Sequence, residues 1–287
     1  MNGRNGEGLG ALFVLVAAIA WSTAGLFTRV VATDVPTTLL WRSIFGGFSV
    51  LVISFAVRRD QPIRDLVRFS LGELIIAAIS ALGMMCFISA FFFTSIANVA
   101  FVYGAMPLIT MLLASIVLGE KISPVSVLAT TISFSGVALL VWGGQKFTDF
   151  LGIGLALLMT LFMAGVTVAA KSFPKADPMK AAYLSGFIAA ACVAPLSQFH
   201  GVSAHDYVAL ALYGLVNVGL GFGVYLLGVA RLPALGSALI GLIEIPLAAL
   251  WAFLLFGESL TRPVMMGGIL ILLSSVIYLC HSARSSE

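Results

Sequence analysis

The sequence predicts an all-α polytopic membrane protein in which ten transmembrane helices form two inverted five-helix repeats. Three observations lead to this prediction. The chain of 287 residues is 61% hydrophobic and only 9% charged, with a mean hydropathy of +1.12. Its apolar residues gather into ten long segments, five in each half of the chain. One pattern of proline, glycine and glutamate recurs near the end of each half, 138 residues apart.

The composition excludes several classes of protein. Soluble domains are about 25% charged, so much of this chain's surface must face lipid. The net charge is only +3, and the basic residues are scattered over loops, which argues against nucleic acid as a partner. Cys86, Cys192 and Cys280 lie far apart in apolar segments. We therefore expect no metal site, no disulfide framework and no cofactor.

Each apolar segment is long enough to cross a bilayer, whose core of about 30 Å needs about 20 helical residues. The first segment is too long for a cleavable signal, so we expect it to remain as the first span. A proline near the start of four later segments supports a helix beginning there: Pro36, Pro124, Pro178 and Pro263. The predicted spans are 9–30, 37–57, 74–93, 98–118, 124–142, 150–170, 180–198, 207–229, 235–256 and 263–281.

The fourth and ninth spans carry the repeated pattern. The first copy runs from residue 97 through a mid-span proline to Gly-Glu and a further proline at 124; the second does the same from 235 to 263. Because five is an odd number of crossings, the second half must lie upside down relative to the first. Inverted repeats of this kind build a central site in many transporters. We therefore expect repeats at 1–145 and 146–287.

The distribution of Lys and Arg predicts the orientation, because cytoplasmic loops carry an excess of these residues. With the N-terminus inside, eleven basic residues lie on the cytoplasmic side, three lie outside and one lies within a span. Both termini are therefore expected in the cytoplasm. The cytoplasmic set is Arg4, Arg58, Arg59, Arg64, Arg68, Lys121, Lys171, Lys175, Lys180, Arg231 and Arg284, and the outer set is Arg29, Lys146 and Arg262.

Several motifs resemble those of one transporter family. Residues 95–100 (SIANVA), followed by Pro107 and by residues 117–120 (VLGE), resemble the fourth-span signature of EamA-type ten-span carriers of the drug/metabolite transporter (DMT) superfamily. Trp21-Ser22-Thr23 resembles the first-span motif of that family, and residues 254–258 (LLFGE) resemble the end of its ninth span. Within the superfamily, the chain is most similar in look to YddG-type amino-acid exporters.

The resemblance implies a multi-pass carrier of the bacterial inner membrane that exports small amino acids, including aromatic ones, or related metabolites by alternating access. It implies a cavity lined by spans one, three, four, six, eight and nine, and homodimer contacts through spans five and ten. For each cavity candidate, packing or interfacial anchoring is an equal alternative to substrate contact. The candidates are Trp21, Ser22, Met84, Phe87, Asn98, Tyr103, Met163, Asn217, Tyr225 and Glu244.

Glu244 is the most informative single residue. It lies about nine residues into the ninth predicted span, roughly 14 Å deep at a rise of 1.5 Å per residue. An ionisable group near the membrane midplane is costly unless it is paired, protonated or facing water. One hypothesis makes Glu244 a partner of a substrate ammonium group or a carrier of a coupling proton. The other makes it a protonated residue that bonds a neighbouring helix near Pro246.

Pro107 and Pro246 occupy equivalent mid-span positions. Proline removes an intrahelical hydrogen bond, so these residues are candidate hinges between inward-open and outward-open states, with static kinks as the alternative. The second copy has Glu244-Ile245-Pro246 where the family often has Glu-Pro directly. We therefore expect its helix break one residue later.

Other polar and small residues receive structural interpretations. Arg42, roughly 8 Å from the outer surface, is expected to snorkel to the interface rather than bind a substrate carboxylate. Glu73 is expected to be solvated, and Glu120 to stabilise the N-terminus of the following span. The five glycines between Gly214 and Gly228 predict close helix packing, with a flexible gating helix as the alternative.

Comparison of function classes favours a carrier. An enzyme would need clustered nucleophiles, acids or metal ligands, and the candidates here are isolated, so we expect no catalytic residues. A channel would more often show a filter motif, and none is visible in the sequence. A lipid-linked-sugar flippase and a multidrug exporter remain the alternatives within the transporter class.

Overall fold

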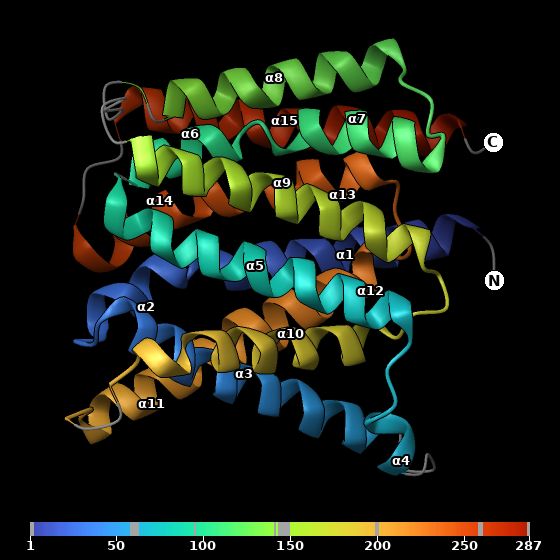
Figure 1. Cartoon of the computed structure of the whole chain (residues 1–287). Coiled ribbons are helices and arrows are strands. Elements are labelled where there is room, and N and C mark those ends of the chain that lie inside the picture. Colours follow the sequence, from blue (N-terminus) through green and yellow to red (C-terminus); the bar gives the residue numbers. More distant parts are fainter. Residues whose placement is uncertain are drawn as a thin grey trace.

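The computed structural model describes residues 3–57, 63–94, 96–140, 142, 150–198, 201–257 and 261–285. Within these residues all regular structure is helical, and no strand occurs. Figure 1 shows the helices running side by side through the bundle, with both termini at the same end. The predicted all-α class is confirmed.

The first half of the chain forms five crossings, two of which consist of two helices in succession. The helices are α1 (Gly3–Ser22) with α2 (Ala24–Val30), α3 (Val35–Val57), the short connecting helix α4 (Ile63–Leu66), α5 (Leu71–Phe93), α6 (Ile96–Tyr103) with α7 (Met106–Leu118), and α8 (Pro124–Leu140).

The second half repeats this arrangement in the opposite direction, since α9 starts at the end of the bundle remote from the termini (Figure 1). Its helices are α9 (Phe150–Ser172), α10 (Pro178–Val193) with a short 3₁₀ turn η1 (Ala194–Leu196), α11 (Ala204–Tyr213) with the π-helix η2 (Gly214–Gly223) and α12 (Val224–Val229), α13 (Ala234–Gly241) with α14 (Glu244–Phe256), and α15 (Arg262–Ser285).

The lengths and composition of these helices fit a multi-pass membrane protein. Among the described residues, nine helical stretches are long and apolar enough to cross a membrane, and α8, with 17 residues, is a shorter apolar helix at the position of the tenth. Many large apolar side chains, such as Ile116 and Phe150, are exposed on the outside. Lipid is the environment in which such a surface is stable.

The two repeats are interlocked rather than side by side. The most extensive contacts pair helices from opposite repeats: α5 with α9, α8 with α15, and α3 with α10. Where α8 meets α15, a Cβ atom on Gly136 would lie 2.8 Å from the carbonyl oxygen of Gly267. Only glycine permits such an approach, which is typical of helix packing in membranes.

The repeat offset of 138 residues holds for backbone geometry as well as for sequence. Helices α6, α7 and α8 begin and α6 and α7 end 138 residues before the matching ends of α13, α14 and α15. Gly119 and Gly257 end α7 and α14 in the left-handed conformation, with φ of 69° and 68°. This conformation favours glycine at a helix C-terminus, so the same local rule ends both helices.

The breaks inside the fourth and ninth crossings keep the same register. They lie at Gly104–Ala105 and at Leu242–Ile243, where the backbone N–H groups of Ala105 and Ile243 each bond a carbonyl three residues earlier. The expectation of a break one residue later in the second repeat is therefore wrong. Pro107 is the second residue of α7 and Pro246 the third of α14. A proline in the first turn removes no intrahelical hydrogen bond, so the extra residue leaves the break in place.

The glycine-rich crossing contains the π-helix η2, which joins α11 to α12. Its glycines lie against other helices, as the sequence predicted: a Cβ on Gly221 would lie 2.5 Å from Nε1 of Trp21, and one on Gly219 would lie 2.6 Å from Oγ of Ser49. The wide π turn and the missing side chains bring the backbone of η2 close to α1 and α3. π-Helical turns are frequent at functional sites.

Candidate functional site

A cavity of about 60 Å³ lies between the two repeats. At roughly 10–15 Å³ for each water, this is room for about four or five water molecules. All six crossings expected from the resemblance contribute to its wall, and α3 contributes as well. The lining residues are Trp21, Arg42, Ser80, Gly83, Met84, Phe87, Tyr103, Met159, Met163, Asn217, Phe222 and Glu244.

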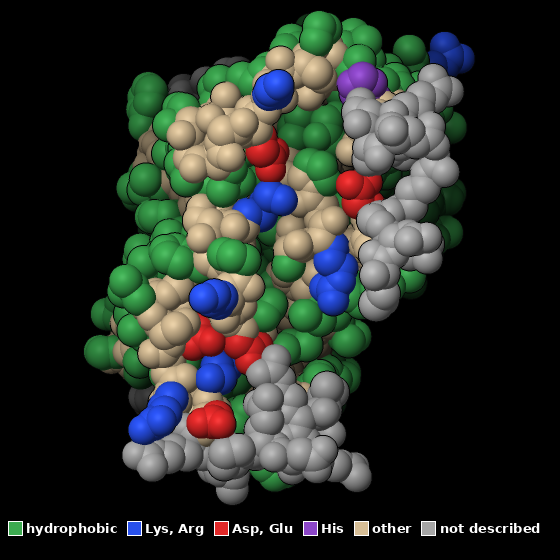
Figure 2. All heavy atoms as spheres, turned by 90° about the vertical axis from the view of Figure 1, so that its right-hand side faces the viewer, with side chains coloured by type: hydrophobic (Ala, Val, Ile, Leu, Met, Phe, Trp, Pro, Cys, Tyr) green, Lys and Arg blue, Asp and Glu red, His purple; other side chains and the backbone are tan. Residues whose placement is uncertain are grey.

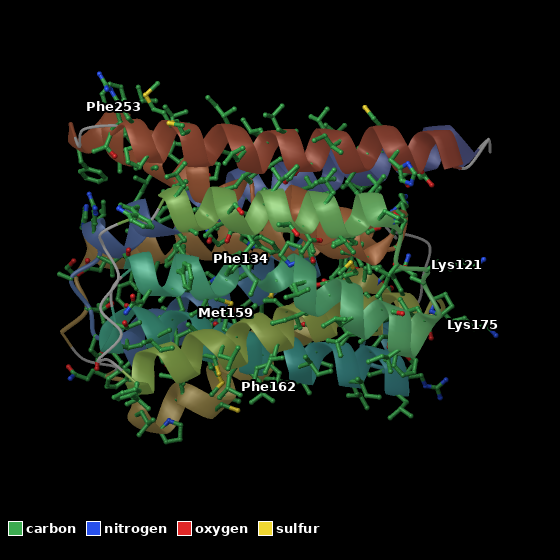
Figure 3. The ribbon with its side chains drawn as sticks, turned by 90° about the horizontal axis from the view of Figure 1, so that it is seen from above. Lys121, Phe134, Met159, Phe162, Lys175 and Phe253 are labelled. Carbon is green, nitrogen blue, oxygen red and sulfur yellow. The ribbon has the colours of Figure 1, made fainter. Side chains whose placement is uncertain are left out.

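Two helix faces supply the apolar wall of the cavity. Ser80, Gly83, Met84 and Phe87 follow one another on one side of α5, at the spacing of three and four residues that a helix face requires. Met159 and Met163 lie one turn apart on α9, and Figure 3 shows Met159 inside the bundle, away from its ends. The flexible thioether of methionine adapts to ligands of different shapes.

A hydrogen-bonded contact joins α1 to η2 beside the cavity. Nε1 of Trp21 donates to the backbone carbonyl of Asn217, 3.0 Å away, and Nδ2 of Asn217 donates to the carbonyl of Ala20 at 3.2 Å. Oδ1 of Asn217 is buried and has no hydrogen-bond partner among the described residues. The Trp21 ring lies 4.9 Å from that of Tyr225. These contacts orient the indole, because its single N–H donor is bound.

The two helix breaks place one polar residue each at the cavity. Tyr103 is the last residue of α6, and Glu244 is the first residue of α14. Glu244 is half-buried and close enough to Tyr103 and Tyr225 to interact with them electrostatically. A helix break thus brings a carboxyl group to the cavity from the midst of an apolar crossing.

Arg42 does not snorkel to the interface, contrary to the expectation from its depth. Only 3% of its surface is exposed, and it lines the cavity. Its guanidinium carbon lies 4.7 Å from the centroid of the Tyr213 ring. The sequence prediction is wrong because α11 and η2 pack over α3 and enclose the side chain, and no sequence pattern reveals that contact.

Three of the cavity candidates do not line the cavity. Oγ of Ser22 donates to the carbonyl of Ile19 at 2.7 Å and accepts from Nε1 of Trp251 at 2.9 Å. Asn98 is 1% exposed and donates to Oγ1 of Thr94 at 2.7 Å. The Tyr225 hydroxyl bonds Oγ1 of Thr167 at 2.6 Å. These residues tie helices together around the site, so packing is the role that the structure indicates for them.

The hinge candidates also lie outside the cavity wall. Pro107 is buried and Pro246 half-buried, each just after the helix break of its repeat. The breaks are present, whereas movement about them stays a prediction.

Sequence reasoning missed four lining residues besides Arg42: Ser80, Gly83, Met159 and Phe222. Helical spacing contained the signal for three of them, since Ser80 and Gly83 share the face of Met84 and Phe87, and Met159 lies one turn before Met163. Phe222 lies in the π-helix, where the ordinary periodicity of 3.6 residues does not apply.

Polar contacts between the repeats close the end of the bundle that carries the termini, where Figure 2 shows basic and acidic side chains together. Glu120, at the end of α7, lies 3.6 Å from Nζ of Lys171 and accepts from the backbone N–H of Ala234 at 3.4 Å. Glu120 therefore stabilises the start of α13 in the other repeat, not the following span as expected. Glu258, its counterpart in the second repeat, lies outside the described residues.

A second contact at this end involves Glu73. Its two carboxylate oxygens accept from the backbone N–H groups of Ser70 at 2.7 Å and Asp177 at 3.0 Å. With 4% of its surface exposed, Glu73 is not solvated as expected, because it caps α5 and holds the loop before α10. Figure 3 shows Lys121 and Lys175 projecting at this end and Phe253 near the opposite one.

Comparison with known proteins agrees with this architecture. The profile of the EamA-like transporter family matches residues 8–142 and, separately, residues 150–280. An uncharacterized transporter of Archaeoglobus fulgidus is 24% identical to this chain, over 93% of this chain and 95% of its own length. An uncharacterized transporter of Clostridium kluyveri is 22% identical over 97% and 95%.

A third curated relative, the uncharacterized transporter YwfM of Bacillus subtilis, is 25% identical over 93% of this chain and 92% of its own. One solved crystal structure superposes with a TM-score of 0.76, covering 97% of this chain and 99% of that chain at 18% identity, which shows a shared fold. Since the family profile matches both repeats and so nearly the whole chain, this multi-pass membrane protein belongs to the EamA-like transporter family.

Proposed function

We propose that this protein is a secondary transporter that exports small amino acids or related metabolites across the bacterial inner membrane by alternating access. The observation that carries the proposal is the cavity between two inverted repeats, reached by a break in the matching helix of each repeat. A site at such an interface can be exposed to either side when one repeat moves against the other.

The wall of the cavity supports an amino acid with an apolar side chain. Phe87, Phe222 and the two methionines of α9 offer apolar surface, while Glu244 offers an acceptor for an ammonium group. Binding sites of this kind combine a mainly apolar lining with a few placed polar groups. The YddG-type resemblance of the sequence points to the same substrate class.

The distribution of charge supports an orientation with both termini in the cytoplasm. Lys171, Lys180 and Arg231 lie in or beside connections at the end that carries the termini, as the positive-inside rule requires of a cytoplasmic end. The Glu120 and Glu73 contacts close that end, so the conformation described here is the one in which cytoplasmic access is restricted.

Counterflow tests the proposal. Proteoliposomes of purified protein are loaded with unlabelled valine, phenylalanine, threonine or glycine, and entry of the same labelled amino acid is followed. We expect saturable exchange for valine and phenylalanine, with competition between them. No exchange above empty liposomes for any amino acid, with the protein shown to be inserted, would refute amino-acid transport and favour a lipid-linked sugar or a cationic drug.

A further inference from the structure

Arg42 is a buried cation without a counter-charge. Its Nε and Nη1 atoms have no hydrogen-bond partner among the described residues, and none of the ion pairs found there involves it. The side chain is 3% exposed and lines the cavity. Its one polar neighbour of note is Tyr213, whose hydroxyl is itself buried without a partner.

Structural stabilisation does not account for this arrangement. A guanidinium has five N–H donors, and a charge removed from water is strongly unfavourable unless it is paired and hydrogen-bonded. The face of Tyr213 compensates only in part, since a cation–π contact satisfies no N–H donor. Within membranes, an ionisable side chain facing an interior cavity generally belongs to a substrate or ion pathway.

We infer that Arg42 binds the carboxylate of the transported substrate and that the substrate is a zwitterion, with Glu244 receiving its ammonium group. The inference rests on the proposed function and specifies its substrate class. Arg42 comes from α3 of the first repeat and Glu244 from α14 of the second. A zwitterion therefore bridges the two repeats, while a cation would meet the uncompensated positive charge of Arg42.

A single carboxylate fits this cavity better than a phosphate does. Arg42 is the only Lys or Arg among the lining residues, and Glu244 lines the same cavity. Phosphate dianions are usually held by several basic groups or by helix N-termini. One guanidinium and one carboxylate together neutralise one carboxylate and one ammonium, so the loaded cavity has no net charge.

Three small ligands separate the two ends of the substrate. Valine has both groups, isovalerate keeps only the carboxylate, and isobutylamine keeps only the ammonium. Binding is titrated with purified protein in lipid nanodiscs by tryptophan fluorescence, since Trp21 lines the cavity. For Arg42→Gln we expect valine and isovalerate to bind at least about tenfold more weakly than to the wild type, as loss of a charged hydrogen bond predicts. Isobutylamine should bind at least as well.

Matched variants separate binding from structure. Arg231→Gln removes a guanidinium at the exposed end of α12 and should leave all three isotherms unchanged. Arg42→Lys keeps the charge but loses the bidentate geometry, so carboxylates should bind with intermediate affinity. Without ligand, Arg42→Gln should unfold at the same temperature as the wild type, because no hydrogen bond is lost. If Arg42→Gln does not fold, Arg42→Lys replaces it, and wild-type affinity for isovalerate would overturn the inference.

Several outcomes would overturn the assignment. Equal affinity of the wild type and Arg42→Gln for valine and isovalerate would show that Arg42 binds no carboxylate. Arg42-dependent binding of inorganic phosphate, with no binding of either carboxylate, would assign the site to a phosphorylated substrate instead. Arg42-dependent binding of isovalerate together with silent counterflow would leave the carboxylate site standing and refute amino-acid transport.

Discussion

At the residue scale, the cavity combines two ionisable side chains that the fold keeps apart from other charges. Glu244 and Arg42 both line the cavity, and no ion pair of either is found among the described residues. Glu244 begins α14, so its position depends on the break before it. Arg42 lies within the unbroken helix α3. The polar groups therefore belong to a rigid helix on one side and to a helix terminus on the other.

Replacing Glu244 by Gln keeps the size of the side chain and its hydrogen bonding but removes its negative charge. We expect half-saturation of valine counterflow to rise about tenfold or more, because a hydrogen bond to a charged group contributes roughly 1.5–3 kcal/mol. Wild-type affinity should fall as the pH is lowered from about 8 to about 5, since protonation of the carboxyl removes the ammonium partner. The Gln variant should lack this dependence.

The control for this measurement is Glu7→Gln, which removes a carboxylate near the start of α1 and should leave the pH profile of the wild type intact. Unchanged half-saturation and an unchanged pH profile in Glu244→Gln would refute both the ammonium-binding and the proton-carrier role.

At the scale of elements, the breaks in the fourth and ninth crossings are the features that the two repeats share most closely. Both begin the second helix with a proline in its first turn, and both end it at a left-handed glycine. The proline cannot donate a hydrogen bond to the helix before it, so α6 and α7, or α13 and α14, cannot fuse into one regular helix at that residue. Each break is therefore maintained by covalent structure.

Pro107→Ala and Pro246→Ala restore a backbone N–H group and permit a continuous helix across the break. We expect each to reduce the turnover rate of counterflow severalfold, while half-saturation changes less, because neither proline lines the cavity. Pro178→Ala, at the start of α10, is the matched control. Wild-type turnover in both variants would exclude a hinge role.

At the scale of the whole molecule, the end that carries the termini is held by contacts between the repeats. The Glu120–Lys171 pair joins α7 to α9, and Nζ of Lys171 also donates to the carbonyl of Leu232 at 2.7 Å, before α13. The side chains of the pair are 22% and 28% exposed, so the pair contributes at most about 1 kcal/mol. A contact of this strength can hold the end closed and still open during transport.

Glu120→Gln should make the cavity more accessible from this end. In a background with the native cysteines replaced by alanine, Ser80→Cys reports on the cavity wall. A membrane-impermeant maleimide added from the side of the termini should label it up to about fivefold faster when Glu120 is replaced, as loss of about 1 kcal/mol predicts. Lys175→Gln, an exposed charge at the same end, should not change the rate. Equal rates in both variants would contradict a closing role for Glu120.

The sequence by itself determined the membrane class, the ten crossings and the inverted repeat, because hydrophobic length and the parity of crossings are properties of the chain alone. It also pointed to Glu244 and to the two faces around Met84 and Met163, since helical spacing is local. Only the tertiary structure decided that Arg42 is enclosed, that Glu73 and Glu120 join the repeats, and that Tyr225 lies behind the cavity wall. Those outcomes depend on contacts between helices far apart in the sequence, which no local pattern records.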